Sequence, residues 1–248
     1  MSRELGPADL AVLKENLEGV RGRIARACGR VGRDPAEVSL VAVTKYSGPA
    51  VARALLQLGQ RDLGESRTAH LVELDAALPP GEARWHMVGH LQRNKAKDVA
   101  GRLHALHSLD SAELLARLEA LRPPELPPLR AYVEVRLDPR ETRSGVDPAA
   151  LPGFLTGLPA CQRVRLVGLM GLPPLPPGEP DEAALAAAAR PHFRRLRGLL
   201  EALPAGALAG RELSMGMTQD LEVAVEEGAS VVRVGRALLA GLSPEALG

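Results

Sequence analysis

Hydrophobic residues at helical spacing open the chain. Within residues 8–32, Leu13, Leu17, Val20 and Ile24 recur every three or four positions among charged and polar residues. This spacing places apolar side chains on one face of a helix. The sequence therefore predicts an N-terminal helix at about 8–32 whose apolar face packs against the rest of the protein.

After this helix, short apolar runs alternate with helical stretches. Residues 38–45, VSLVAVTK, are apolar and β-branched, as is typical of strands buried on both faces. Residues 49–59 follow with helical periodicity, a Pro at the start and a Gly at the end. The other predicted strands are 62–65, 83–89, 103–110, 129–137, 163–171, 211–216 and 230–236. The other predicted helices are 66–77, 91–101, 111–121, 148–158, 181–202 and 218–227.

This alternation predicts an α/β barrel. Strands separated by helices of about ten residues favour parallel pairing. Eight such units in a chain of 248 residues fit a closed barrel better than an open sheet. We therefore expect a single (β/α)₈ TIM-type barrel domain over residues 1–248. In such barrels the functional side chains gather at the carboxyl ends of the strands.

Composition excludes several classes of function. Hydrophobic residues make up 46% of the chain and charged residues 25%, close to the average of soluble globular proteins. The net charge of +1, without a basic run rich in aromatic residues, argues against nucleic-acid binding. No stretch approaches the roughly 20 apolar residues of a membrane span, and the N-terminus does not resemble a secretory signal. Because Cys28 and Cys161 lie far apart, we expect reduced thiols and a cytoplasmic protein.

Lysine is rare in this chain, and Lys45 stands at the end of the first predicted strand. Only four of the 31 basic residues are lysines, and a lysine amine, unlike a guanidinium, can become neutral and nucleophilic. Apolar neighbours at a strand end favour this neutral form by desolvation. The alternative is a lysine that extends its charge into water. These residues alone support both interpretations equally.

The last two predicted strands end in loops that contain glycine and precede helices. Ser214, Gly216 and Thr218 follow the seventh strand, and Gly235 opens a short helical turn after the eighth. Loops in these places form the recurrent phosphate site of barrel proteins; the alternative is a pair of ordinary tight turns. A phosphate site across the barrel from Lys45 indicates a phosphorylated aldehyde as the ligand. Sugar phosphates and pyridoxal phosphate both fit.

Arg233 lies in the otherwise apolar eighth strand, two residues before Gly235. A buried guanidinium needs a partner, because burial of an unpaired charge costs several kcal/mol. If it faced a pyridine nitrogen, it would keep this nitrogen unprotonated and make the cofactor a weaker electron sink. This favours pyridoxal phosphate as the ligand. The alternative is a structural ion pair with Glu134 or Glu65.

Several strings of residues resemble the pyridoxal phosphate homeostasis proteins. They extend from about residue 10 to residue 241, nearly the whole chain. The strings are AVTK (42–45), GE (64–65), WHMVGHLQRNKAK (85–97), HSLD (107–110), RSGV (143–146), GLMGLP (168–173), LSMGMTQDLEVAVEEG (213–228) and VVRVGRALLAG (231–241). The resemblance implies the barrel of the alanine racemase N-terminal domain, known as fold type III of the proteins that bind pyridoxal phosphate.

The resemblance also implies roles for individual residues. Lys45 would hold pyridoxal 5′-phosphate as a Schiff base, and Arg233 would face the pyridine nitrogen of this cofactor. The residues that would hold the phosphate are Ser214, Gly216, Met217, Gly235 and Arg236. In this arrangement the cofactor lies across the mouth of the barrel, between the first strand and the last two.

This chain departs from the family pattern at four positions. Ser66 stands where asparagine is usual, and its hydroxyl can still hydrogen-bond near the ring over a shorter reach. Arg236 replaces a threonine and could add a charge-assisted phosphate contact. Ser47 and Arg143 stand where lysines are common. Because neither of these can form an imine, we expect Lys45 to be the single attachment site, with one cofactor per chain.

Three histidines lie near the ends of the third and fourth predicted strands, namely His86, His90 and His107. A group of histidines raises the question of a metal, but no spacing of carboxylate and histidine in the sequence supports one. We therefore expect no metal site. His86 is predicted instead to be a hydrogen-bonded residue of the barrel mouth and a contact of the cofactor.

We expect a protein that stores and delivers the cofactor rather than an enzyme. A fold type III racemase needs a second acid–base residue, supplied with the help of a second domain, and a chain ending at residue 248 leaves no room for one. The expected transient partners are apo-enzymes that depend on pyridoxal phosphate, and the lack of a dimerising domain favours a monomer. Two alternatives remain, a racemase-like amino-acid enzyme and a Schiff-base aldolase of a phosphorylated sugar.

Overall fold

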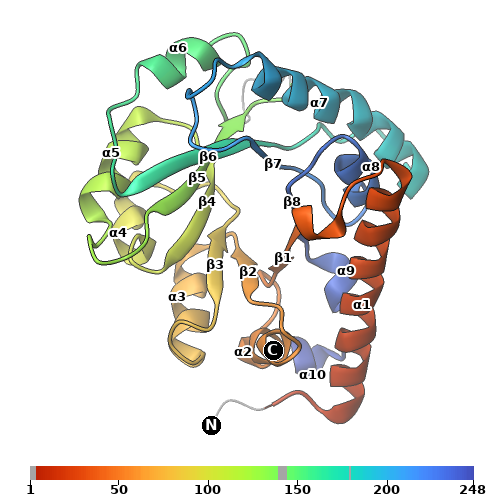
Figure 1. Cartoon of the computed structure of the whole chain (residues 1–248). Coiled ribbons are helices and arrows are strands. Elements are labelled where there is room, and N and C mark those ends of the chain that lie inside the picture. The colour runs from red at the N-terminus through yellow and green to blue at the C-terminus, as the bar shows by residue number, and fades with distance from the viewer. Residues whose placement is uncertain (1–3, 139–143, 179) are drawn as a thin grey trace.

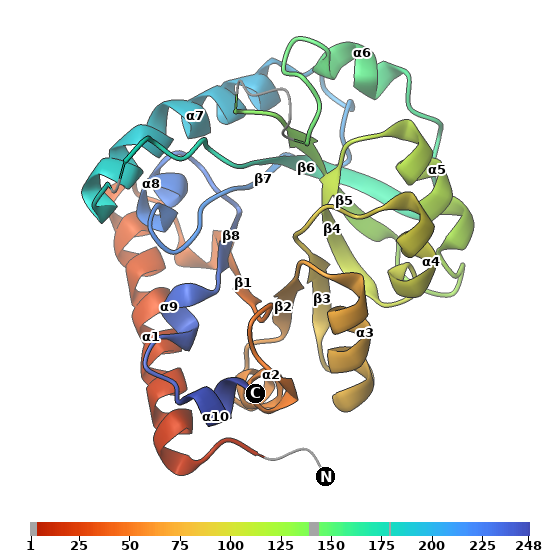
Figure 2. The same cartoon turned by 180° about the vertical axis from the view of Figure 1, so that it is seen from behind.

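The computed structural model describes residues 4–138, 144–178 and 180–248, and it forms a closed barrel of eight parallel strands (Figures 1 and 2). Each strand pairs with the next one in the chain, and the eighth pairs with the first. The strands are β1 (Ser39–Val43), β2 (Asp62–Glu65), β3 (Arg84–Met87), β4 (Leu103–Leu109), β5 (Leu129–Val135), β6 (Val164–Gly171), β7 (Glu212–Ser214) and β8 (Val231–Val234). The predicted barrel is confirmed.

Helices follow the strands and surround the barrel (Figure 1). They are α1 (Pro7–Arg30), α2 (Pro49–Gln57), α3 (Thr68–Ala77), α4 (Ala96–Val99), α5 (Ala112–Leu121), α6 (Leu151–Thr156), α7 (Glu182–Ala202), α8 (Leu221–Glu226), α9 (Arg236–Leu239) and α10 (Pro244–Leu247). The helix predicted over 91–101 is divided into a 3₁₀ turn at Arg93–Lys95 and the short α4. Among the described residues, no helix is both long enough and apolar enough to cross a membrane.

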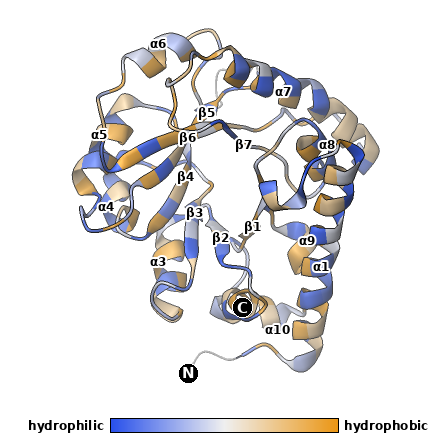
Figure 3. Cartoon of the chain, in the orientation of Figure 1, coloured by the Kyte–Doolittle hydropathy of each residue, from blue (hydrophilic) through white to orange (hydrophobic). Residues whose placement is uncertain are grey.

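The N-terminal helix α1 covers the side of the barrel where the last strand meets the first. Its apolar stripe, which includes Leu13, Leu17 and Val20, is buried as the sequence predicts, and the helix lies along α8 and α9 (Figures 1 and 2). Nε of Arg23 is 2.6 Å from Oε1 of Glu222 and so ties α1 to α8. Hydrophilic and hydrophobic residues are mixed along α1 and α7 (Figure 3), as expected for helices with one buried face.

The inside of the barrel is partly apolar and partly polar. Its apolar part is a cluster of buried side chains from six residues of five strands, Val41, Ala105, Tyr132, Val167, Met170 and Val231. The polar part includes His86, His107, Ser214 and Arg233, all of them buried. Buried polar groups need hydrogen-bond partners, and the partners of these four residues define the candidate site.

Candidate functional site

Lys45 is the second residue after β1, at the C-terminal end of the barrel. The preceding residue fixes this strand end, because the Thr44 hydroxyl donates to Oε1 of the buried Glu65 over 2.7 Å. Lys45 itself is half-buried, and its Nζ is 4.8 Å from the centroid of the Tyr46 ring. No carboxylate of the described residues lies within 4.0 Å of Nζ. With respect to these residues, the amine is therefore available for a covalent bond.

Two of the departures from the family pattern lie close to the ends of β1 and β2. Ser47 is buried, and its hydroxyl donates to the carbonyl oxygen of Thr44 over 3.1 Å, which closes a tight turn. Ser66 is half-buried, and Gly89 packs so closely against it that a Cβ on Gly89 would lie 2.5 Å from the Ser66 carbonyl oxygen. Arg143, a further departure, lies outside the described residues.

The loop after β8 lies beside the strand end that bears Lys45. The parallel register pairs Ala42 of β1 with Val234 of β8, so the next residue, Gly235, stands at the same level as the end of β1. A Cβ on Gly235 would lie 3.1 Å from the carbonyl oxygen of Val43. Glycine therefore allows the two strand ends to approach closely, as a phosphate loop facing Lys45 requires.

The loop after β7 depends on Gly216. Its φ of +93° lies in the left-handed region that favours glycine, and a Cβ there would lie 2.5 Å from a side chain of α8. The amide of the next residue, Met217, donates to Oδ1 of the buried Asp220, whose pKa is raised by burial. The exposed Arg236 donates from Nη2 to Oε1 of Gln219 over 2.6 Å. Both donors are engaged within the protein, and their contact with phosphate stays a prediction.

Arg233 extends from β8 into the barrel interior and is only 5% exposed. Its Nη1 donates to Oγ of Ser214 over 2.6 Å, whereas Nη2 has no hydrogen-bond partner among the described residues. Within the same residues, neither Glu134 nor Glu65 lies within 4.0 Å of this guanidinium, so the alternative structural ion pair is not formed. Burial lowers the pKa of Arg233 to about 10. The side chain therefore keeps its charge at neutral pH and retains an unsatisfied donor.

Ser214 belongs to a hydrogen-bonded chain that crosses the barrel interior. Its Oγ is 2.7 Å from Nδ1 of His107, and Nε2 of His107 is 2.9 Å from Nδ1 of His86. Nε2 of His86 is in turn 3.0 Å from Oδ1 of Asp62, the first residue of β2. The chain runs from Arg233 on β8 to Asp62 at the N-terminal end of the barrel.

Arg233 and Asp62, at the two ends of this series of hydrogen-bonded side chains, fix the direction of every hydrogen bond in it. Burial acts to raise the pKa of Asp62, but its interactions with His86 and Arg84 are stronger, and the net shift is downward. This carboxylate is therefore ionised and can only accept hydrogen bonds. Burial also lowers the pKa values of His86 and His107, so both rings are neutral at neutral pH. A guanidinium only donates. Each ring therefore carries its proton on Nε2, and the hydroxyl hydrogen of Ser214 points at His107.

His86 does not lie where the sequence analysis expected it. It is hydrogen-bonded, as predicted, but it is 4% exposed and is directed towards Asp62 at the N-terminal end of the barrel, so its predicted position at the mouth is wrong. Alternation along a strand indicates which face a side chain takes, but it does not indicate its depth inside a barrel. Contact of His86 with the cofactor stays a prediction.

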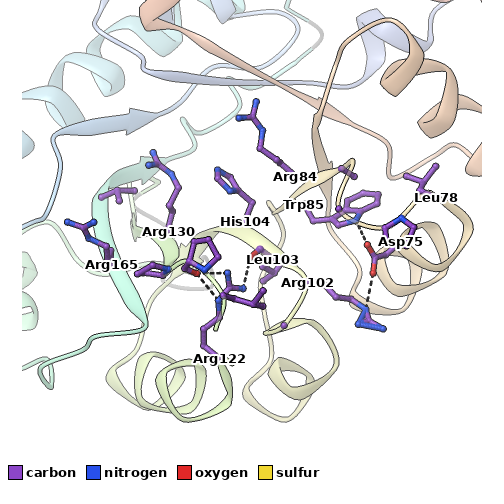
Figure 4. A pocket seen from close by; sticks show the side chains of 18 of the residues that line it. Asp75, Leu78, Arg84, Trp85, Arg102, Leu103, His104, Arg122, Arg130 and Arg165 are labelled. Carbon is purple, nitrogen blue, oxygen red and sulfur yellow. Dashed lines mark hydrogen bonds and ion pairs between the residues drawn. The ribbon is translucent and has the colours of Figure 1, made fainter. Parts of the chain in front are cut away.

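Asp62 and His86 meet a third side chain that could bind a metal, His104, at the N-terminal end of the barrel. The sequence analysis expected no metal site and did not bring these three residues together. One ligand atom each from Asp62, His86 and His104 lies within 4.8 Å of the others. Burial lowers the pKa of His104 to about 4. His104 also lines a cavity of about 810 Å³ together with Arg84 and Arg130 (Figure 4). This cavity lies at the end of the barrel opposite Lys45.

Comparison with known proteins places the chain in a family. The family of alanine racemase N-terminal domains matches residues 9–244. A pyridoxal phosphate homeostasis protein of Pseudomonas aeruginosa is 37% identical over 229 residues, which cover 92% of this chain and 95% of that protein. The chain belongs to the pyridoxal phosphate homeostasis protein family. Another member of this family, from Escherichia coli, is 31% identical over 233 residues and is covered to 95%.

Solved structures share the barrel of this homeostasis protein family member. PipY of Synechococcus elongatus, solved without PLP, is 32% identical and has a TM-score of 0.77 over 92% of this chain and 100% of PipY. The structure of PipY with PLP bound has a TM-score of 0.73. Alanine racemase of Clostridium difficile is 14% identical with a TM-score of 0.58, and 55% of its chain is covered, which shows a common fold alone. The predicted family and fold are confirmed.

Proposed function

We propose that this protein holds pyridoxal 5′-phosphate on Lys45 and stores and delivers this cofactor in the cytoplasm. Its membership of the homeostasis protein family and the PLP-bound structure of PipY support the cofactor. The observation that carries the proposal is the unsatisfied Nη2 of Arg233. This buried donor lies in β8, the strand that pairs with β1, whose end bears Lys45.

Lys45 and Arg233 would hold opposite sides of the cofactor ring. Nζ of Lys45 would form the covalent bond to the aldehyde carbon as a Schiff base, and Nη2 of Arg233 would donate to the ring nitrogen. Bound pyridoxal phosphate supplies an electron sink, which is weak when its nitrogen faces a guanidinium and stays unprotonated. This pairing favours a stored cofactor over a catalytic one.

The phosphate would be held by the loops after β7 and β8. Gly216 and Gly235 leave space for its close approach, and the Met217 amide and the Arg236 guanidinium are the nearby donors. The carboxylate of Asp220 now accepts the Met217 amide. Phosphate would have to replace this carboxylate, whose raised pKa makes it easier to protonate and displace.

Three other residues are predicted to contact the cofactor, and they differ in how directly they would reach it. Ser66 is half-buried after β2 and would hydrogen-bond near the ring. Ser214 is fully buried and directs its hydrogen to His107, so it would act on the phosphate only after this hydrogen bond is given up. His86 lies one step further along the same chain and would act through His107.

The barrel mouth would also be the surface that apo-enzymes contact during delivery. Four exposed large apolar side chains follow the C-terminal ends of strands β1, β6 and β7, and they are Tyr46, Leu172, Leu175 and Met217. Exposed apolar groups around a ligand site are typical of transient interaction surfaces. We propose that the protein acts as a monomer, which leaves this mouth free for a partner.

Borohydride reduction tests the attachment site. Purified protein incubated with pyridoxal phosphate, reduced and digested should show one modified lysine by mass spectrometry, Lys45. Lys45→Ala should lose the near-visible absorbance of the bound cofactor, whereas Lys14→Ala, which changes an exposed lysine of α1, should keep it. Modification that persists in Lys45→Ala, or that is spread equally over all lysines, would contradict the proposal. Delivery predicts that the holoprotein restores a pyridoxal-phosphate-dependent apo-enzyme in stoichiometric amounts.

A racemase-like enzyme is the second candidate because of Glu134. This carboxyl group is buried in β5, its pKa is raised by burial, and Ser144 donates to its Oε1 over 2.8 Å. It also lines a cavity of about 220 Å³ with Met217. Such a group is a candidate for proton transfer. Membership of the pyridoxal phosphate homeostasis family argues against the third alternative, an aldolase of a phosphorylated sugar.

Exchange of the α-proton of amino acids distinguishes storage from catalysis. The storage proposal predicts that the holoprotein exchanges the α-protons of L- and D-amino acids in deuterated water no faster than free pyridoxal phosphate does. Rapid exchange that is lost in Glu134→Gln, with the cofactor still bound, would establish an enzyme instead.

A further inference from the structure

We propose that Asp62, His86 and His104 form a binding site for a divalent transition metal ion, Zn²⁺ in the first place, at the N-terminal end of the barrel. The three side chains come from the neighbouring strands β2, β3 and β4. Two imidazoles and one carboxylate are a ligand set of zinc sites that keep a fourth position open. The site lies at the opposite end of the barrel from Lys45, and the proposal does not rest on the proposed function, although His86 links the site through His107 and Ser214 to Arg233.

The geometry is close to that of a tetrahedral site. Zinc bonds of roughly 2.0–2.2 Å place ligand atoms roughly 3.3–3.5 Å apart. Nε2 of His86 and Oδ1 of Asp62 are already 3.0 Å apart, and all three ligand atoms lie within 4.8 Å of one another. His104 is half-exposed and can close the remaining gap by rotating its side chain. Figure 4 shows His104 between Arg84 and Arg130, directed into the cavity.

An irregularity in the sheet brings His104 to this place. Trp85 pairs with Leu103 and His86 pairs with Ala105, so His104 is an extra residue of β4 with no counterpart in β3. Without this bulge, alternation would turn His104 away from the interior, because Ala105 is already an interior residue. Bulges near functional sites re-aim side chains in this way. Neither ring nitrogen of His104 has a hydrogen bond with a described residue, so no protein contact has to be broken before His104 binds a metal.

The charges around the site leave Asp62 available to a metal. Nη2 of Arg84 binds Oδ2 of Asp62, so Oδ1 is the oxygen that faces His86. Arg130 is paired with Glu212, at 2.6 Å from its Oε1. Arg130 is thus paired with a carboxylate outside the site, whereas Arg84 is paired with Asp62 itself and is the kind of outer-shell partner that orients a ligating carboxylate. Water or an anion from the cavity of about 810 Å³ would fill the fourth position.

His107 supplies the outer-shell partner of His86. A metal on Nε2 of His86 requires the proton of this ring on Nδ1, where Nε2 of His107 can accept it. His107 then carries its own proton on Nδ1 and donates to Oγ of Ser214. A hydroxyl oxygen accepts two hydrogen bonds, so Ser214 still accepts from Arg233. Both rings change tautomer, the number of protons stays the same, and every nitrogen of the two rings keeps a partner.

Titration of the full-length, chelator-treated protein with Co²⁺ and Zn²⁺ tests this site without added pyridoxal phosphate. We expect one ion per chain, with the visible absorption of four-coordinate Co²⁺, which Zn²⁺ then abolishes. His104→Ala and Asp62→Asn should weaken binding at least about 10–100-fold, since even the loss of an outer-shell partner costs that much. His192→Ala changes a half-buried histidine of α7 and should bind as the wild type does.

Three results for the wild type and the control would overturn the proposal, as would a fourth for a further variant. They are the lack of saturable one-to-one binding, a weak six-coordinate Co²⁺ spectrum, and an equal loss of affinity in His192→Ala. His104→Gln keeps a polar side chain without a ring nitrogen, and its thermal unfolding shows whether the barrel is intact. If this variant is folded and binds Zn²⁺ as tightly as the wild type, His104 is not a ligand. Because no cofactor is present, none of these results depends on Lys45.

Discussion

The hydrogen-bonded chain inside the barrel predicts that Ser214→Ala is strongly destabilising. The substitution removes the donor to Nδ1 of His107 and the acceptor of Nη1 of Arg233, and both side chains are at most 5% exposed. A buried polar group left without a partner costs about 1–3 kcal/mol, and more when it is charged. With two such groups, the free energy of unfolding should fall by about 2–6 kcal/mol, a large part of the roughly 5–15 kcal/mol typical of a domain.

Ser108→Ala is the matched control. Ser108 is as buried as Ser214, but its hydroxyl makes one hydrogen bond, a donation to the carbonyl oxygen of Gly89 over 2.7 Å. Its loss leaves one neutral acceptor unsatisfied and should cost about 1 kcal/mol. Urea unfolding of the cofactor-free proteins measures both changes, because a lower midpoint at an unchanged m-value reports a loss of stability.

The outcome that refutes this reasoning is equal destabilisation by the two variants. It would mean that His107 and Arg233 find other partners, such as water that enters the space of the lost hydroxyl. The deduced hydrogen-bond direction would then lose its support, since it requires Ser214 to donate to one neighbour while it accepts from the other.

Three more predictions concern other parts of the fold. Gly216→Ala should destabilise by about 1–3 kcal/mol more than Gly206→Ala in urea unfolding, because both glycines have positive φ but only Gly216 has a neighbour within 4 Å of the added Cβ. Equal effects would contradict the close packing of Gly216 against α8. Burial, assisted by Glu119, raises the pKa of Cys161 to about 11, so its rate of alkylation should keep rising up to about pH 11, and Glu119→Gln should lower this midpoint; a plateau near pH 9 would refute it. Arg122→Leu should lower the thermal midpoint markedly, because the guanidinium satisfies carbonyl oxygens of three segments; an unchanged midpoint would show that these carbonyls find water.

The sequence was sufficient to predict the barrel and the position of Lys45, for a physical reason. Apolar runs such as 38–45 alternate with helical stretches, and parallel strands place all their carboxyl ends at one end of a barrel. Lys45 and Gly235, 190 residues apart, were therefore expected at the same end of the barrel. The register of β1 and β8 places them there, on neighbouring strands rather than across the barrel. The predicted strand ends differ from the observed ones by a few residues, which does not change this placement.

The depth of side chains inside the barrel could not be predicted from the sequence. His86 and His107 lie on consecutive strands, and their hydrogen bond depends on strand tilt and register, which the alternation of residues leaves open. His104 enters the interior only through the bulge in β4. A bulge adds one residue without a distinctive sequence, so the cluster of Asp62, His86 and His104 is visible only in the structure.

Arg233 is hydrogen-bonded to Ser214 and not to a carboxylate. The sequence did not indicate this pairing, which has a consequence for function. The expected alternative was an ion pair with Glu134 or Glu65, and a carboxylate in contact with the guanidinium would have offset its charge at the predicted ring nitrogen. A hydroxyl satisfies Nη1 without adding a negative charge. The chain of neutral groups then ends on the carboxylate of Asp62 at the far end of the barrel, where Arg84 balances it. The barrel interior thus gives Arg233 a hydrogen-bond partner and leaves its positive charge available for the ring nitrogen that we propose it faces.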